Sequence, residues 1–100
     1  MSDFNSHDFD KILNNIKYKI GSVAECDSVR SIESNLDTKG MMFKSKSNPI
    51  KNGMLIIGED KGSIAVDISI DDNSSVRSFI LKNKYDTDGV NNIVKWFERN

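Results

Sequence analysis

His7 and Cys26 are the one imidazole and the one thiol in a chain of 100 residues, so they are the first side chains to weigh for chemistry. A cysteine nucleophile needs a base within hydrogen-bonding distance of its sulfur. The sequence predicts a helix over residues 7–20, which is about 21 Å long. His7 then lies in the first turn of this helix and Cys26 lies beyond its far end. A buried, inert thiol and a solvent-facing imidazole fit this spacing better than a catalytic dyad.

The carboxylates of residues 86–88 suggest a second chemistry, because Asp86-Thr87-Asp88-Gly89 is similar to the start of a calcium-binding loop. When Gly89 is aligned with the invariant glycine of such a loop, Lys84 takes the first ligand position and Lys95 takes the place of the final glutamate. Two cations therefore stand where two carboxylates are required. The pattern does not predict a metal site.

The remaining carboxylates and glycines give no stronger signal. Asp67, Asp71 and Asp72 form a cluster only if a turn brings them together, and we interpret them as solvated turn residues. Nothing marks two of the 15 acidic residues as a pair facing each other across a substrate cleft. The glycines are spaced as turns and helix caps and not as a phosphate-binding loop. We expect no enzyme activity, no metal and no cofactor.

Length and composition fit one compact domain over residues 1–100, of which we expect residues 1–5 to be disordered. The chain is 37% hydrophobic and 29% charged, which is ordinary for a soluble globular domain. A formal net charge of −1 argues against a dedicated polyanion binder. Its longest aliphatic run, Met54 to Ile57, is far shorter than the ~20 residues of a membrane-spanning helix. With no apolar leader and a single cysteine, the cytoplasm is the expected compartment.

Two segments have the spacing of amphipathic helices. In residues 7–20 the apolar positions are Phe9, Ile12, Leu13, Ile16 and Ile20, with Ser6 as the predicted N-cap and Gly21 as a left-handed terminator. In residues 87–98 they are Val90, Ile93, Val94 and Phe97, with Thr87 or Asp88 as the N-cap.

The intervening sequence predicts strands over residues 41–46, 54–58, 63–70 and 76–84. The turns expected between them are Asn52-Gly53, a type I turn with a bulge at Glu59–Gly62, and Asp71–Ser74. Residues 22–38 fit a helix or a strand. We favour a strand, because Asp37–Gly40 is typical of a hairpin turn ending in a left-handed glycine. The fold class is therefore α+β: an N-terminal helix, an antiparallel meander of 4–5 strands and a C-terminal helix.

Aromatic side chains point to an interface. Tyr18 lies opposite the apolar stripe of the first helix, flanked there by Lys11 and Asn14. This is the position of an interface anchor, although a lone surface tyrosine needs no such role. Trp96 lies at the edge of the second apolar stripe, so we expect it to be half-buried, either as core edge or as a hot spot.

The predicted strands carry bulky side chains on both faces, for example in Met54–Ile57. Either helices cover both faces of the sheet, or one face keeps an apolar patch beside Met42, Lys44 and Lys46. An open patch of this kind marks an interface or a dimer.

Lysines concentrate in residues 39–61. The set is Lys39, Lys44, Lys46, Lys51 and Lys61. Such a segment can meet nucleic-acid phosphates, but it contains no arginine, and lysines on edge strands also guard against aggregation.

These features favour a small protein-binding inhibitor, such as an immunity protein, an antitoxin or a phage-encoded anti-defence protein, which occludes the surface of a protein target such as a nuclease or a toxin. The helix–meander–helix plan resembles that of several small phage-encoded inhibitors, including some anti-CRISPR proteins, with no shared motif. We expect a monomer or homodimer that does not bind membranes. The partner-binding residues we expect are Tyr18, Lys11, Asn14, Met42, Lys44, Lys46, Lys51 and Trp96. The alternative is a small RNA- or DNA-binding protein that uses the basic loop 39–61, with Lys44, Lys46 and Lys51 as its contacts.

Overall fold

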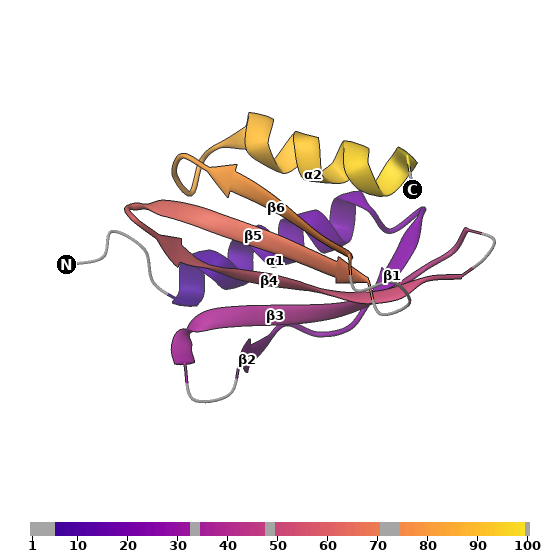
Figure 1. Ribbon diagram of the computed structural model, residues 1–100, viewed down its shortest axis with the longest axis horizontal. Helices are drawn as coiled ribbons and strands as arrows, with labels where there is room; N and C mark the ends of the chain where they lie inside the picture. The colour runs from indigo at the N-terminus through magenta and orange to yellow at the C-terminus, as the bar shows by residue number, and fades with distance from the viewer. Residues whose placement is uncertain (1–5, 33–34, 48–49, 71–74, 100) are drawn as a thin grey trace.

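The computed structural model describes residues 6–32, 35–47, 50–70 and 75–99 (Figure 1). Residues 1–5, which we expected to be disordered, lie outside this part of the chain. The elements follow in the order α1 (Ser6–Lys19), β1 (Ala24–Cys26), β2 (Arg30–Ile32), β3 (Asn35–Ser45), β4 (Asn52–Asp60), β5 (Ser63–Ile70), β6 (Ser75–Leu81) and α2 (Thr87–Arg99). The predicted α+β class and the order of its elements are confirmed.

All strands belong to one antiparallel sheet in the order β1-β3-β4-β5-β6. The long strand β3 has β4 along one side, while β1 and β2 share its other side. Segment 22–38 therefore contributes short strands and the start of β3, which agrees with the strand that the sequence favoured. Strand β5 has the predicted bounds, because its strict alternation leaves one register in which the apolar residues are buried.

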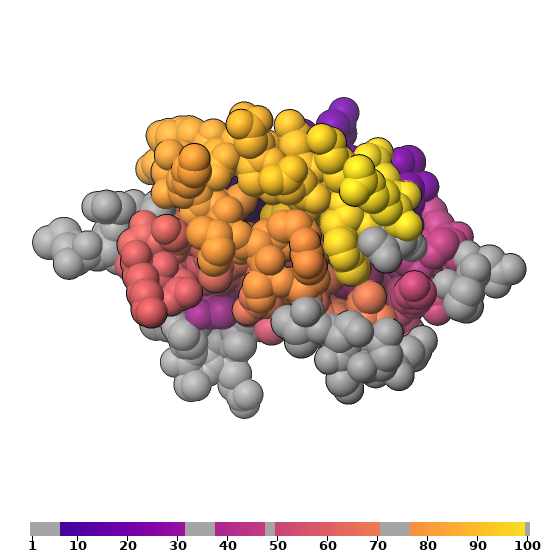
Figure 2. All heavy atoms as spheres, turned by 45° about the horizontal axis from the view of Figure 1, so that its top comes forward, coloured from indigo at the N-terminus to yellow at the C-terminus, as the bar shows by residue number. Residues whose placement is uncertain are grey.

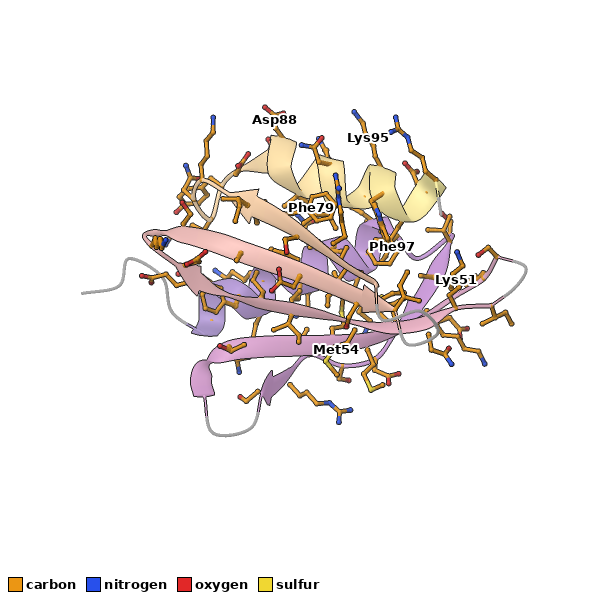
Figure 3. All side chains as sticks on the ribbon, in the orientation of Figure 1. Lys51, Met54, Phe79, Asp88, Lys95 and Phe97 are labelled. Atoms are coloured by element: carbon orange, nitrogen blue, oxygen red, sulfur yellow. The ribbon has the colours of Figure 1, made fainter. Side chains whose placement is uncertain are left out.

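Both helices cover the same face of the sheet. Helix α1 packs on β3 and β4, while α2 runs beside β6 and contacts α1 (Figure 1). Phe97 points from α2 toward the sheet, whereas Asp88 and Lys95 point away from it (Figure 3). The apolar stripes of both helices and one side of each long strand form a single hydrophobic core.

Neither of the two described helices lies on the opposite face of the sheet, and we call it the open face. It carries the outward side chains of the strands, including Met42, Met54, Ile56 and Ile80. Met42 is 40% exposed and Ile80 56% exposed. Of the two arrangements that the sequence left open, the structure has the one with an uncovered apolar patch.

The turn predicted at Asn52-Gly53 is wrong, because both residues begin β4 and pair with Lys44 and Phe43. Gly53 allows the Phe43 ring and the backbone of β5 to approach β4 closely. A Cβ atom on it would lie 2.6 Å from Cζ of Phe43 and would overlap the backbone oxygen of Ser69. The aromatic ring of Phe43 thus covers the glycine across the strand pair.

The turn predicted at Asp37–Gly40 is also wrong, because these residues lie within β3. Neither Gly40 nor Gly21 has the positive φ expected of it. Helix α1 instead ends in a succession of backbone bonds, in which the carbonyl of Ile20 accepts from the N–H groups of Val23 and Ala24. Tight hydrogen-bonded turns end this helix without a left-handed residue.

The β4–β5 hairpin closes through Lys61 and Gly62, which have φ of 52° and 83°. Positive φ at both central residues, with Asp60 paired to Ser63, makes this a two-residue type I′ turn instead of the predicted type I turn with a bulge. The mirror-image turn matches the twist of the flanking strands. The turn predicted at Asp71–Ser74 lies outside the described residues.

Strand β6 ends at Leu81, so the predicted strand over residues 76–84 is too long at its C-terminal end. The N-cap of α2 is Asp86 and not Thr87 or Asp88: its carboxylate accepts a bond of 3.0 Å from the backbone N–H of Gly89. Residues 82–86 form a separate loop between β6 and α2.

Candidate interaction surface

The outward face of α1 carries three of the residues predicted to contact a partner. Lys11, Asn14 and Tyr18 are all exposed, and Tyr18 is 87% exposed. Positions 11 and 18 lie almost directly above one another on a helix, about 10 Å apart along its axis. The structure therefore brings these three side chains together on one stripe.

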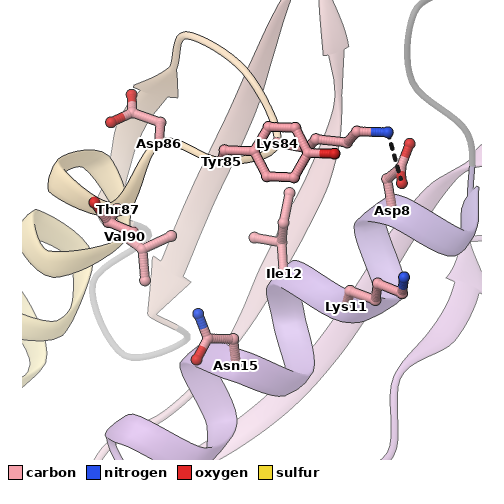
Figure 4. A pocket seen from close by; sticks show the side chains of 9 residues that line it. All are labelled: Asp8, Lys11, Ile12, Asn15, Lys84, Tyr85, Asp86, Thr87 and Val90. Atoms are coloured by element: carbon pink, nitrogen blue, oxygen red, sulfur yellow. Dashed lines mark ion pairs between the residues drawn. The ribbon is translucent and has the colours of Figure 1, made fainter.

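Beside this stripe lies a groove of about 400 Å³ between α1 and the loop that precedes α2 (Figure 4). We call it the α1–α2 groove. It is lined by Asp8, Lys11, Ile12, Asn15, Lys84, Tyr85, Asp86, Thr87 and Val90. Figure 2 shows α2 on the outer surface above β6.

The loop over residues 82–86 is built by hydrogen bonds within itself. The Asp86 carboxylate accepts from the backbone N–H of Lys82 at 2.9 Å as well as from Gly89. Both bonds lower the pKa of the Asp86 carboxyl below its usual value, and the bond from Lys82 has the larger effect. The Asn83 side chain accepts from the N–H of Tyr85 at 2.8 Å. The backbone that carries Tyr85 is thus fixed from both sides.

Tyr85 is 77% exposed and stands at the rim of the groove. The Nζ atom of Lys84 lies 5.5 Å from the centroid of the Tyr85 ring, within the range of a cation–π contact. The same Nζ lies 3.6 Å from the carboxylate of Asp8 on α1 (Figure 4). Lys84 therefore links the loop to the first turn of α1.

The groove combines an apolar base with balanced charge. Ile12 and Val90 are each 6% exposed and contribute to the core beneath it. Asp8 and Asp86 line the groove together with Lys11 and Lys84, so the charges of its lining cancel. Such a surface suits a protein segment of mixed character better than a polyanion.

The remaining predicted contacts lie elsewhere. Met42 and Lys44 are on the open face, on the other side of the sheet from α1. Lys46 donates from Nζ to the carbonyl of Gly21 at 2.9 Å. The eight predicted residues therefore do not form one surface.

Lys51 and Trp96 are half-buried, and both line a small hollow near the C-terminal end of α2. Trp96 meets the Phe97 ring edge-on, with centroids 5.1 Å apart, and Phe97 in turn meets Phe43 at 5.0 Å. Half-burial of Trp96 agrees with the sequence prediction.

The lysines of segment 39–61 do not form one patch. Lys39 is half-buried, with its Nζ 3.6 Å from the Asp10 carboxylate and 3.1 Å from Oγ of Ser31. Lys61 lies in the β4–β5 turn, at the opposite end of β4 from Lys51. Only Lys44, Lys46 and Lys51 gather at one end of the sheet.

His7 lies near the start of α1, whereas Cys26 lies on β1, which follows the C-terminal end of the helix. Cys26 pairs with Phe43 on the helix-covered side, and its partial burial raises the pKa of the thiol. His7 is exposed near the start of α1. Within residues 6–32, 35–47, 50–70 and 75–99, no group of three or more His, Cys, Asp or Glu side chains is placed to hold a metal ion. Neither described helix has the length and apolar character needed to cross a membrane.

Tyr85, Lys84, Asp8 and Asn15 are not among the contacts predicted from the sequence. The predicted strand over residues 76–84 runs through most of the loop 82–86 and therefore conceals it. Asp86 is an N-cap residue type that stands before the apolar stripe of α2, and an N-cap assigned there would have ended the strand earlier.

Comparisons with known proteins give no assignment for this surface. No protein-family model, no curated protein and no solved structure matches the chain.

Proposed function

We propose that this protein binds a protein partner and has no chemistry of its own. It acts by covering part of the partner's surface, as an inhibitor, an immunity protein, an antitoxin or a phage-encoded anti-defence protein does. The observation that carries the proposal is the 77% exposed Tyr85 at the rim of the α1–α2 groove, with the 87% exposed Tyr18 on the neighbouring stripe of α1.

Tyrosine is well suited to this task. Its ring supplies a large contact area, its hydroxyl supplies a hydrogen bond, and little side-chain entropy is lost on binding. The loop bonds made by Asn83 and Asp86 hold the Tyr85 backbone before any partner arrives. Preorganisation of this kind raises affinity because less ordering is needed on association.

The charge of the groove supports a protein as the partner. Lys11 and Lys84 stand beside Asp8 and Asp86, and the chain as a whole has a net charge of −1. A polyanion would gain little from this lining, whereas a protein segment with apolar and mixed polar groups would match it. A nuclease or a toxin is the kind of target that such a protein occludes.

The second candidate is a nucleic-acid-binding protein that uses Lys44, Lys46 and Lys51, which lie at one end of the sheet. Lys46 and Lys51 are partly engaged there, by the carbonyl of Gly21 and by the hollow beside Trp96. Contacts of this kind would make affinity fall steeply with salt.

The test compares variants of the two surfaces in binding to the captured partner. Tyr18→Ala and Tyr85→Ala should each weaken binding about 30-fold, which is ~2 kcal/mol, because each removes an aromatic anchor. Both side chains are exposed, so the fold should be retained, as circular dichroism and the melting temperature would show. Tyr85→Phe keeps the ring and should lose only part of this affinity.

The matched control is the pair Lys44→Glu and Lys46→Glu, which leaves the α1–α2 groove unchanged. We expect it to change affinity less than threefold. Loss of binding in this double variant, with unchanged binding by the tyrosine variants, would refute the α1–α2 groove as the binding surface and favour the lysine-bearing end of the sheet.

A further inference from the structure

The open face has a charge pattern that is complementary to itself. One row of outward positions crosses it from β2 to β5: Arg30 pairs with Gly40, Gly40 with Ile56 and Ile56 with Asp67. Residues directly paired across strands share a face, so these four lie side by side in this order. The row has a cation at one end and a carboxylate at the other.

In the middle of the same row, a bulky side chain lies next to a position that has no side chain. Ile56 projects from β4, and its neighbour Gly40 on β3 has no side chain. In the next row, Met42 on β3 lies beside Met54 on β4. The apolar side chains Met42, Met54 and Ile56 thus lie between the two charged positions.

We propose that the open face binds a second copy of this chain, around a two-fold axis that runs along the strands between β3 and β4. This rotation places Arg30 against Asp67 of the partner copy twice, once at each end of the row. It also sets Ile56 over the partner's Gly40 and Met42 against the partner's Met54. The same two-fold rotation therefore pairs the opposite charges of the row and places the bulky side chain over the glycine.

The twist of the sheet is compatible with this axis. A two-fold rotation about the strand direction carries a twisted sheet onto a second one that stays parallel to the first over the whole face. Sheets packed face to face keep their strands within about 30° of each other. The second copy therefore meets the face without gaps at its corners.

A hydrogen bond within the chain orients the Asp67 carboxylate. Oγ of Ser78 on β6 donates to the Asp67 carboxylate at 2.7 Å, and the remaining lone pairs of the carboxylate can accept from a guanidinium. Arg30 is exposed at the opposite edge.

The size of the shared face is that of a weak, reversible interface. Four strand positions at about 4.8 Å and four outward rows at about 6.8 Å give about 500 Å² per copy, on the order of 1,000 Å² in total. This lies at the lower limit for a specific interface, so the dimer should dissociate in the micromolar range. Both tyrosine-bearing grooves stay free, on opposite sides of the pair.

The test is sedimentation equilibrium of the full chain from low micromolar to about 1 mM, the range in which a face of this size should associate. The weight-average mass should rise from 11.3 kDa toward twice that value. Arg30→Asp and Asp67→Arg should each weaken self-association about tenfold, and the double exchange should restore it to within about threefold of wild type.

A matched pair of variants separates this contact from general stickiness. Ile56→Lys lies at the centre of the shared face and should abolish the dimer, whereas Ile80→Lys lies on β6 beyond it and should leave the dimer intact. A chain that stays monomeric at about 1 mM, or single charge exchanges that the double exchange does not rescue, would overturn the proposal. Binding through the α1–α2 groove is measured separately and does not depend on this result.

Discussion

Asp86 is the residue on which the presentation of Tyr85 depends. Its carboxylate accepts from the backbone N–H groups of Lys82 and Gly89 and thereby joins the end of β6 to the start of α2. A Cβ atom on Gly89 would lie 3.1 Å from Oδ2 of Asp86 and would overlap the Leu81 side chain. The carboxylate at position 86 thus joins the two elements, and a side chain at position 89 would require the Leu81 side chain to move.

This arrangement predicts how stability varies with pH. The folded-state pKa of Asp86 is depressed, so its contribution to stability is present above the unfolded-state pKa and is lost as pH falls through the folded-state pKa. Asp86→Ala should lower the melting temperature by a few degrees at pH 7, and the difference from wild type should shrink in acid. Thermal unfolding measured from pH 7 down to acid checks this.

Asp86→Asn is the matched control, because its amide oxygen still caps the helix while its amide nitrogen cannot accept from Lys82. It should fall between wild type and Asp86→Ala. Equal pH dependence in wild type and the alanine variant would contradict this role for the carboxylate.

At the residue scale, exposure was predictable where the periodicity was unambiguous. Tyr18 stands opposite a complete apolar stripe, and the structure leaves it exposed. Tyr85 was not predictable in the same way, because a loop residue has no period that assigns it a face. Its exposure follows from hydrogen bonds made by Asn83 and Asp86, which sequence spacing indicates only weakly.

At the scale of the elements, strict alternation of apolar and polar residues predicted a strand better than turn-forming residues predicted where the strands begin and end. Residues 63–70 alternate strictly and form β5 with those bounds. Asn52-Gly53 has the composition of a tight turn, yet it begins β4, because the Phe43 ring needs a glycine opposite it. The contact between strands outweighs the turn preference of Asn52-Gly53.

The two glycines of β4 allow a direct comparison. A Cβ on Gly53 would overlap the Ser69 backbone, whereas a Cβ on Gly58 would meet Oγ1 of Thr38 at an ordinary 3.4 Å. Gly53→Ala should lower the free energy of unfolding by about 2 kcal/mol. Gly58→Ala should leave it unchanged or raise it by about 0.5 kcal/mol, because alanine restricts the unfolded chain.

Urea unfolding of both variants measures the difference. If Gly53→Ala were as stable as Gly58→Ala, the close approach of β5 and Phe43 to Gly53 would not matter to the fold.

For the molecule as a whole, the decisive feature is that both helices lie on one face of the sheet. Bulky residues on both sides of β4 fit helices on one face or on both, so the sequence left this choice open. The contact between α1 and α2 settles it. The tyrosines then stand on the helical side, and the row from Arg30 to Asp67 stands on the other.

The central claim is that the partner is a protein, and salt-graded affinity capture from the lysate of the native host tests it most directly. The immobilised chain is washed at about 50 mM and then about 500 mM salt, and both protein and nucleic acid are analysed. A single protein that remains in stoichiometric amount after the high-salt wash is the result we expect, because the groove is neutral and its tyrosine contacts are insensitive to screening. Nucleic acid that elutes as the salt rises, with no protein retained, would contradict the account.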